Sequence, residues 1–156
     1  MSGSDLERRL ERLEAIEEIR QLKHLYFAYC DDKYNPPAIA ALFTEDSVWE
    51  GELFGRHVGR EAIRQHFERV SGDIVFAAHL GMNHLIEVDG DTATGKWRMI
   101  MPSVVMTDGI KEARWLLVAY QDTYAKVNGR WMFRTMSTHI NFYSPQLGHW
   151  ADTAVP

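Results

Sequence analysis

The stretch ARWLLVAYQDTYAKVNGRWMFRTMST, residues 113–138, indicates a long β-hairpin. Its dipeptide Asn128-Gly129 is typical of a tight hairpin turn, because both residue types tolerate the positive φ angles that such a turn requires. Residues 113–126 before the turn and residues 130–138 after it carry the aromatic and β-branched side chains that strands favour. We therefore expect two adjacent antiparallel strands late in the chain.

Further strands are expected on the N-terminal side of this hairpin. Residues 74–79, 84–88 and 93–101 are separated by turn signals, with Asp89-Gly90-Asp91 and Asp108-Gly109 the clearest. An earlier strand is predicted at residues 47–50, with a hairpin partner near residues 55–58. The second half of the chain is thus expected to form a meander.

Helical periodicity dominates the start of the chain. Apolar residues recur at steps of three and four from Leu6 to Tyr29, which predicts a long helix over residues 5–32, capped by Ser4 or Asp5. The pair Pro36-Pro37 begins a short second helix through residues 38–43, and residues 60–70 form a third. Helices first and strands later predict an α+β fold, a cone in which a curved antiparallel sheet is closed by three N-terminal helices around a pocket.

Composition narrows the classes of function. With 156 residues and 46% hydrophobic side chains, the chain is expected to form one domain over residues 1–156. A net charge of -5 argues against a nucleic-acid partner. The charged N-terminus, the single cysteine and the lack of any long apolar run predict a cytoplasmic protein that does not enter membranes.

Residues 114–120 are apolar on both faces of the predicted strand. One layer of helices covers only one face of a sheet, so a second copy of the chain is the simplest cover for the other. We expect a homo-oligomer, either a dimer or a trimer. A strand that is merely central in the sheet is the alternative.

Seven histidines invite a metal site, but their spacing does not favour one. The chain has no HxH or HExxH motif, and a regular strand would place His79 and His84 on opposite faces. We therefore expect neither a metal nor another cofactor. Cys30 is interpreted as a core residue, and His24, His57 and His66 are expected on the surface because they fall on charged segments.

Two polar residues interrupt apolar elements. Asp31 lies 18 residues after Leu13, about five helical turns, and so shares the apolar face of the first helix unless the helix frays there. His79 interrupts an apolar strand on the face of Val75 and Ala77, and a buried imidazole needs hydrogen-bond partners. Taken alone, His79 is more typical of a core histidine. A carboxylate bound to one ring nitrogen would instead leave the other free to accept a proton.

Four short motifs carry a resemblance to a known family: Tyr26-Phe27-Ala28-Tyr29-Cys30-Asp31, Gly59-Arg60-Glu61-Ala62-Ile63-Arg64, Ala78-His79-Leu80-Gly81 and Asn141-Phe142-Tyr143-Ser144-Pro145. With them, the chain from about residue 8 to residue 150 resembles the SnoaL-like branch of the NTF2-like superfamily. Within that branch it is most similar to the cofactor-free hexachlorocyclohexane dehydrochlorinase, scytalone dehydratase and bile-acid 7α-dehydratase group.

The resemblance implies a catalytic pair formed by Asp31 and His79, and a substrate-binding hydroxyl at Tyr26. It is incomplete, since Met101 stands where the bile-acid enzyme has a second pocket aspartate, and the late basic residue of the dehydrochlorinase has no clear counterpart. The implied activity is a cofactor-independent lyase, of dehydratase or dehydrohalogenase type, in which neutral His79 takes a proton from a hydrophobic cyclic substrate.

Other residues are candidates for substrate contact. Trp49, Trp97, Met99 and Met101 would form an apolar wall, although each fits ordinary core packing equally well. His139, beside Asn141, is either a second acid or a solvated strand end. Two other functions stay open at this point: a polyketide cyclase or ketosteroid-type isomerase, and a non-catalytic small-molecule-binding module like the small subunits of ring-hydroxylating dioxygenases.

Overall fold

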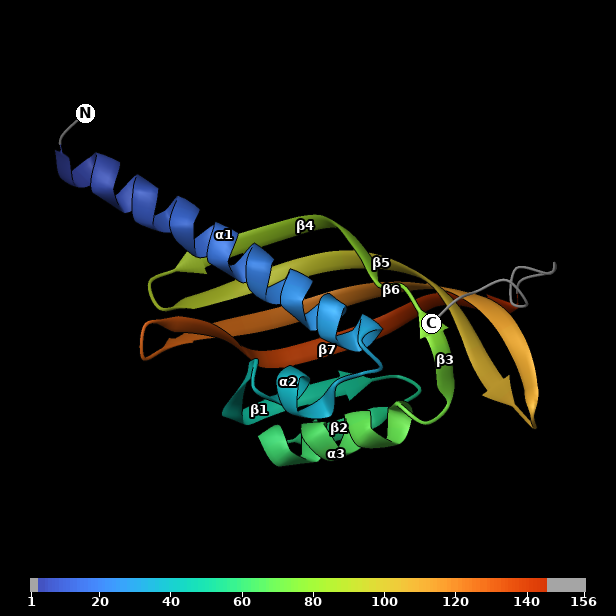
Figure 1. Ribbon diagram of the computed structural model, residues 1–156. Helices are drawn as coiled ribbons and strands as arrows, with labels where there is room; N and C mark the ends of the chain where they lie inside the picture. Colours follow the sequence, from blue (N-terminus) through green and yellow to red (C-terminus); the bar gives the residue numbers. More distant parts are fainter. Residues whose placement is uncertain (1–2, 146–156) are drawn as a thin grey trace.

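The computed structural model describes residues 3–145 and has an α+β architecture, as predicted (Figure 1). Its helices are α1 (Gly3–Asp31), α2 (Pro36–Ala40) and α3 (Arg60–Val70). Its strands are β1 (Phe43–Gly51), β2 (Gly55–Val58), β3 (Ile74–Ala77), β4 (Leu80–Asp89), β5 (Thr92–Thr107), β6 (Ile110–Val127) and β7 (Arg130–Pro145).

One curved, open sheet holds the strands in the order β2-β1-β7-β6-β5-β3, with β4 also paired to β5. The β6–β7 hairpin turns at Asn128 and Gly129, whose φ angles are +51° and +79°, as the sequence predicts. Five strands, β1 and β4 to β7, are longer than expected; β5 continues through Pro102 to Thr107, and β7 runs on to Pro145. The sheet is not wholly antiparallel, since β1 pairs with β7 in parallel.

Helix α1 crosses one face of the sheet, whereas α2 and α3 lie beside β1 and β2 (Figure 1). The half of α1 that packs on the sheet is the C-terminal half, through residues such as Ile19 and Phe27. The N-terminal turns project past the sheet, and their apolar residues Leu6, Leu10 and Leu13 are 56%, 54% and 64% exposed.

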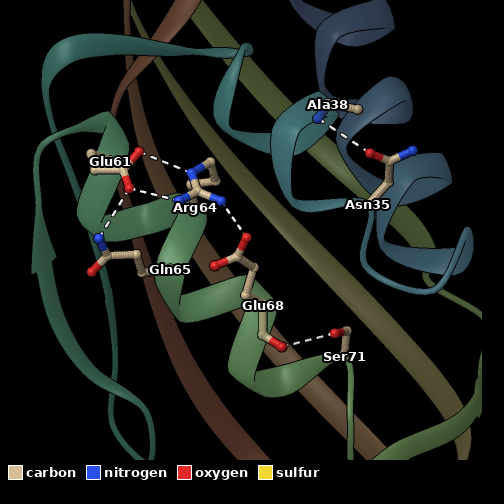
Figure 2. A network of polar contacts seen from close by, with 7 residues as sticks. All are labelled: Asn35, Ala38, Glu61, Arg64, Gln65, Glu68 and Ser71. Carbon is tan, nitrogen blue, oxygen red and sulfur yellow. Dashed lines mark hydrogen bonds and ion pairs between the residues drawn. The ribbon is translucent and has the colours of Figure 1, made fainter.

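Helix α3 has a charged outer face and a buried inner face (Figure 2). On the outer face, Arg64 pairs with both Glu61 and Glu68. The inner face contains His66, which was expected on the surface but is only 5% exposed. Its packing between Ile63 and Phe67 on the apolar face of α3 explains the difference, because helical position outweighs the charge of sequence neighbours.

The short helix α2 is positioned by its cap. Asn35 accepts a hydrogen bond from the Ala38 amide at 3.3 Å, and prolines occupy the first helical positions (Figure 2). No helix within residues 3–145 combines the length and the apolar character needed to cross a membrane.

Candidate active site

Asp31 and His79 meet where the end of α1 faces the loop between β3 and β4. Oδ1 of Asp31 lies 2.6 Å from Nδ1 of His79, and the His79 amide donates to both carboxylate oxygens at 3.0 and 3.2 Å. The Asp31 carboxylate thus contacts both the backbone amide and the ring of His79, which fixes the orientation of the imidazole. Because a carboxylate only accepts hydrogen bonds, Nδ1 carries a proton and Nε2 of the neutral ring is an acceptor.

The second ring nitrogen of His79, Nε2, contacts a tyrosine that the sequence analysis missed. The Tyr34 hydroxyl lies 3.3 Å from Nε2 of His79. Tyr34 follows α1 with a φ of +52°, next to Lys33 with a φ of +53°, and this left-handed turn brings its side chain under the sheet. Burial raises the pKa of the Tyr34 phenol well above its usual value, so the group stays protonated. No sequence motif marks this position.

The His79 ring is largely enclosed, at 5% side-chain exposure, while Asp31 is 37% exposed at the helix end. Phe27 stacks against the imidazole, with ring centroids 6.0 Å apart. Gly81 makes room for this stack, because a Cβ at that position would lie 2.2 Å from the Phe27 ring. The strand therefore needs a glycine beside the histidine for steric reasons.

His79 lines an apolar cavity of about 80 Å³ between the sheet and the helices. Four of the expected substrate contacts line this cavity: Tyr26, Trp49, Met99 and Met101. The indole N–H of Trp49 donates to the Tyr26 hydroxyl at 3.3 Å, which fixes both side chains. The remaining lining residues are largely apolar or aromatic: Tyr34, Phe54, His66, Phe67, Val70, Ile74, Leu116, Val118, Tyr120, Thr138 and Ile140.

Three expected contacts lie elsewhere. Trp97 is buried on the same strand face as Met99 but donates to the Tyr124 hydroxyl at 3.0 Å, away from the cavity. His139 is exposed, and its Nδ1 lies 2.6 Å from Oε1 of Glu52. Asn141 is also exposed and accepts a hydrogen bond from Arg98. His139 and Asn141 alternate along β7 with Thr138 and Ile140, which line the cavity, so their side chains lie on the other face of the strand.

The cavity continues into an outer cleft of about 680 Å³. Both spaces are lined by His66, Met101 and Leu116, and the cleft adds the charged side chains of Arg69 and Arg114. A cavity of about 150 Å³ holds a benzene molecule. The inner space is about half as large, so we expect a cyclic ligand to extend into the cleft.

Comparison with known proteins identifies the family. A profile described as a SnoaL-like domain matches residues 11–137, which is most of the chain. The chain belongs to the SnoaL-like domain family. The resemblance inferred from the motifs is thus confirmed at the level of the family.

Solved structures share the fold of this SnoaL-like domain. The hexachlorocyclohexane dehydrochlorinase LinA-type3 from Novosphingobium barchaimii LL02 is 22% identical, with a TM-score of 0.81 over 90% of this chain and 96% of that one. A candidate scytalone dehydratase from Novosphingobium aromaticivorans DSM 12444 is 21% identical, with a TM-score of 0.76 over 88% and 91%. At these identities the likeness establishes the NTF2-like fold. No protein with a curated function matches the chain.

Beneath the cavity of the SnoaL-like domain lies a second feature that the sequence analysis missed, a buried ion pair. Nζ of Lys23 on α1 is 2.8 Å from Oδ2 of Asp122 on β6, and both side chains are fully buried. The ammonium also lies 3.6 Å from the ring centroid of Tyr120, whose face borders the cavity. Burial lowers the pKa of Lys23 and raises that of Asp122, while each partner opposes the shift of the other.

The sequence does contain signals for the missed residues. His66 lies three residues after Ile63 and four before Val70, on the apolar face of α3. Lys23 likewise lies four residues after Ile19 and three before Tyr26, on the apolar face of α1. Helical periodicity applied to polar residues would have predicted both as buried.

Cys30 is buried, as expected, and burial raises the pKa of its thiol. This keeps the side chain in the unreactive thiol form. Within residues 3–145, no three or more His, Cys, Asp or Glu side chains cluster in a way that could hold a metal ion.

Proposed function

We propose that this SnoaL-like protein is a cofactor-independent lyase that removes a proton from a hydrophobic cyclic substrate. The observation that carries the proposal is the 2.6 Å contact between Asp31 and Nδ1 of His79, a residue that lines an apolar cavity. A neutral imidazole oriented by a carboxylate is a general base whose contribution is about 10²–10⁴-fold in rate.

In the proposed reaction, Nε2 of His79 takes a proton from a ring carbon of the substrate. The electron pair of that C–H bond forms a C=C bond, and the leaving group departs from the neighbouring carbon with its own bonding pair as hydroxide or halide. Asp31 stabilises the imidazolium while it carries the proton. Transfer of that proton to hydroxide completes a dehydration, and its release with halide completes a dehydrohalogenation.

Tyr34 is expected to take part in substrate binding. Its hydroxyl contacts the nitrogen that must accept the proton, so a bound substrate has to displace this contact. The displaced phenol then has an unpaired donor beside the reacting carbon. An oxygen of the substrate in that place would satisfy it.

The test compares two histidine–carboxylate pairs of the same geometry. His79→Ala and Asp31→Asn alter the pair at the cavity, whereas His139→Ala and Glu52→Gln alter a surface pair with the same 2.6 Å contact. Purified variants are incubated with hexachlorocyclohexane and with scytalone, and products are followed by mass spectrometry. We expect His79→Ala to lower turnover by about 100-fold or more. Turnover that survives in His79→Ala would refute the proposal.

An isomerase or cyclase acting through an enolate is the second candidate. The Tyr34 hydroxyl beside Nε2 favours it, because a protonated phenol in an apolar cavity stabilises an enolate oxygen. Mass spectrometry separates the two activities. An isomerase or cyclase of this type produces no loss of water or hydrogen halide.

We also propose that the chain forms a homo-oligomer through the sheet face opposite α1. A row of apolar residues crosses four neighbouring strands on that face, namely Leu80, Ile100, Leu117 and Phe142. Leu80 and Phe142 are exposed. Light scattering of the wild-type chain and of Leu117→Lys tests this, and a monomer at high concentration in both would refute it.

The cytoplasmic location stays a prediction.

A further inference from the structure

His66 places an imidazole at the junction between the inner cavity and the outer cleft, and it lines both. The ring is packed among other rings, with centroid distances of 4.1 Å to His57 and 4.6 Å to Trp49. None of the residues from 3 to 145 forms a hydrogen bond with either of its ring nitrogens. A largely buried polar side chain therefore reaches the site with no hydrogen-bond partner among the residues that the structure describes.

The His66 ring is not sealed in the core, because the side chain lines both the cavity and the cleft. Three side-chain atoms in the described part of the chain are both fully enclosed and unpartnered, namely Ser47 Oγ, Asp122 Oδ1 and Trp131 Nε1. The nitrogens of His66 are not among them, and the His66 side chain lines both the cavity and the cleft. A molecule in that space is the available partner for them.

The charge state of His66 limits what it can bind. Burial, with smaller electrostatic contributions from His57 and Arg69, lowers the pKa of the His66 imidazole to about 4. Near neutral pH the ring is therefore uncharged, with one N–H donor and one acceptor nitrogen. Such a group bonds well to a hydroxyl or carbonyl oxygen. It offers no charge to an anion, and carbon-bound chlorine is a poor acceptor for its N–H.

The position of His66 fits a cyclic ligand that spans both spaces. A six-membered ring is too large for the inner space of about 80 Å³, so it must pass the junction where His66 lies. One edge of the ring would then face Nε2 of His79. A substituent farther along would face the His66 imidazole.

We propose that His66 donates a hydrogen bond to an oxygen of the substrate, so that the substrate class is an oxygenated ring, an alcohol or a ketone, rather than a halocarbon. This inference rests on the proposed function, because it concerns the substrate of the same site. It assigns His66 to substrate binding and leaves the proton transfer to His79.

Two ligands of nearly equal shape test the inference. Cyclohexanone carries an acceptor oxygen and chlorocyclohexane does not, and their dissociation constants are measured by NMR titration of the protein labelled with ¹⁵N-histidine. We expect wild-type protein to bind cyclohexanone more tightly. His66→Phe should weaken cyclohexanone binding by about 5- to 10-fold, the effect of one hydrogen bond, and leave chlorocyclohexane binding within about twofold.

Further variants separate a hydrogen bond from a packing effect. His66→Gln keeps an N–H donor and should restore most of the cyclohexanone affinity, whereas His139→Phe is the control outside the cavity. His66→Leu replaces His66→Phe if the larger ring prevents folding. Equal losses for both ligands, no loss in either donor-free variant, or no binding of cyclohexanone by the wild-type protein would each overturn the inference.

The binding assay is independent of turnover. If His79→Ala retains full lyase activity, the proposed function fails while the preference for cyclohexanone is unaffected. If His66→Phe binds both ligands as the wild type does, the inference about His66 fails while the role of His79 stands.

Discussion

The buried pair of Lys23 and Asp122 allows a stability prediction that does not depend on the activity. We consider Lys23→Met and Asp122→Asn, which keep the approximate shapes of the side chains and remove their charges. In the native protein the two charges are 2.8 Å apart and fully buried, and Asp122 also accepts a hydrogen bond from Tyr124 at 2.9 Å. Each single substitution leaves the other charge enclosed without its counter-ion.

The expected cost of each single substitution is about 3–5 kcal/mol of unfolding free energy, the usual effect of removing one partner from a buried pair. For a domain of this size that lowers Tm by roughly 10 °C. The double variant contains no buried charge at this position. Its cost should therefore fall well below the sum of the two single costs, giving a coupling energy of about 3 kcal/mol or more.

The pair also predicts how one variant depends on pH. In Lys23→Met the carboxyl of Asp122 loses the cation that opposes the burial effect, so its pKa in the folded state rises further above the unfolded value. A group whose folded pKa is raised stabilises the fold only when protonated. The penalty of Lys23→Met should therefore shrink as the pH falls through the folded pKa of Asp122.

Urea unfolding followed by far-UV circular dichroism measures these free energies for the wild type, both single variants and the double variant. The matched control is the exposed pair of Arg56 and Glu50, for which we expect less than about 1 kcal/mol. If the double variant lost as much unfolding free energy as the two single variants together, the two charges would not depend on each other. That result would refute the reasoning.

Three further predictions concern backbone and protonation. Gly81→Ala should destabilise the protein by about 1–3 kcal/mol and reduce activity, because its Cβ would collide with the Phe27 ring that stacks on His79; unchanged Tm and kcat would contradict this. Gly59→Ala should cost about 1–2 kcal/mol in urea unfolding, because the cap of α3 has a φ of +88°, and a neutral result would contradict the strain. Between pH 6.5 and about 4, His66 binds a proton in the unfolded chain but not in the folded protein. The unfolding free energy of the wild type should therefore fall by roughly 2 kcal/mol over this range. A His66→Gln variant that loses as much stability as the wild type would exclude this cause.

The candidate site was predictable only in part. Asp31 and His79 each interrupt an apolar pattern, and the resemblance to the SnoaL-like branch implied that they form a pair; the structure places the two side chains in contact. Tyr34 could not be found in this way, because its approach depends on a left-handed turn after α1 that no local pattern indicates. The sequence left two alternatives for His139, a second acid or a solvated strand end, because the choice depends on which face of β7 meets the cavity; in the structure the side chain is exposed.

Local sequence patterns by themselves determined the α+β class, the hairpin at Asn128-Gly129 and the residue types able to act as a base. These features depend on periodicity and turn chemistry, which act over a few residues. Only the tertiary structure decided that Lys23 meets Asp122 across 99 positions, that His66 opens onto a cavity, and that the ring of His79 has a phenol on its second nitrogen. Such contacts join distant segments, and their geometry follows from the curvature of the sheet and the packing of α1 and α3 on it.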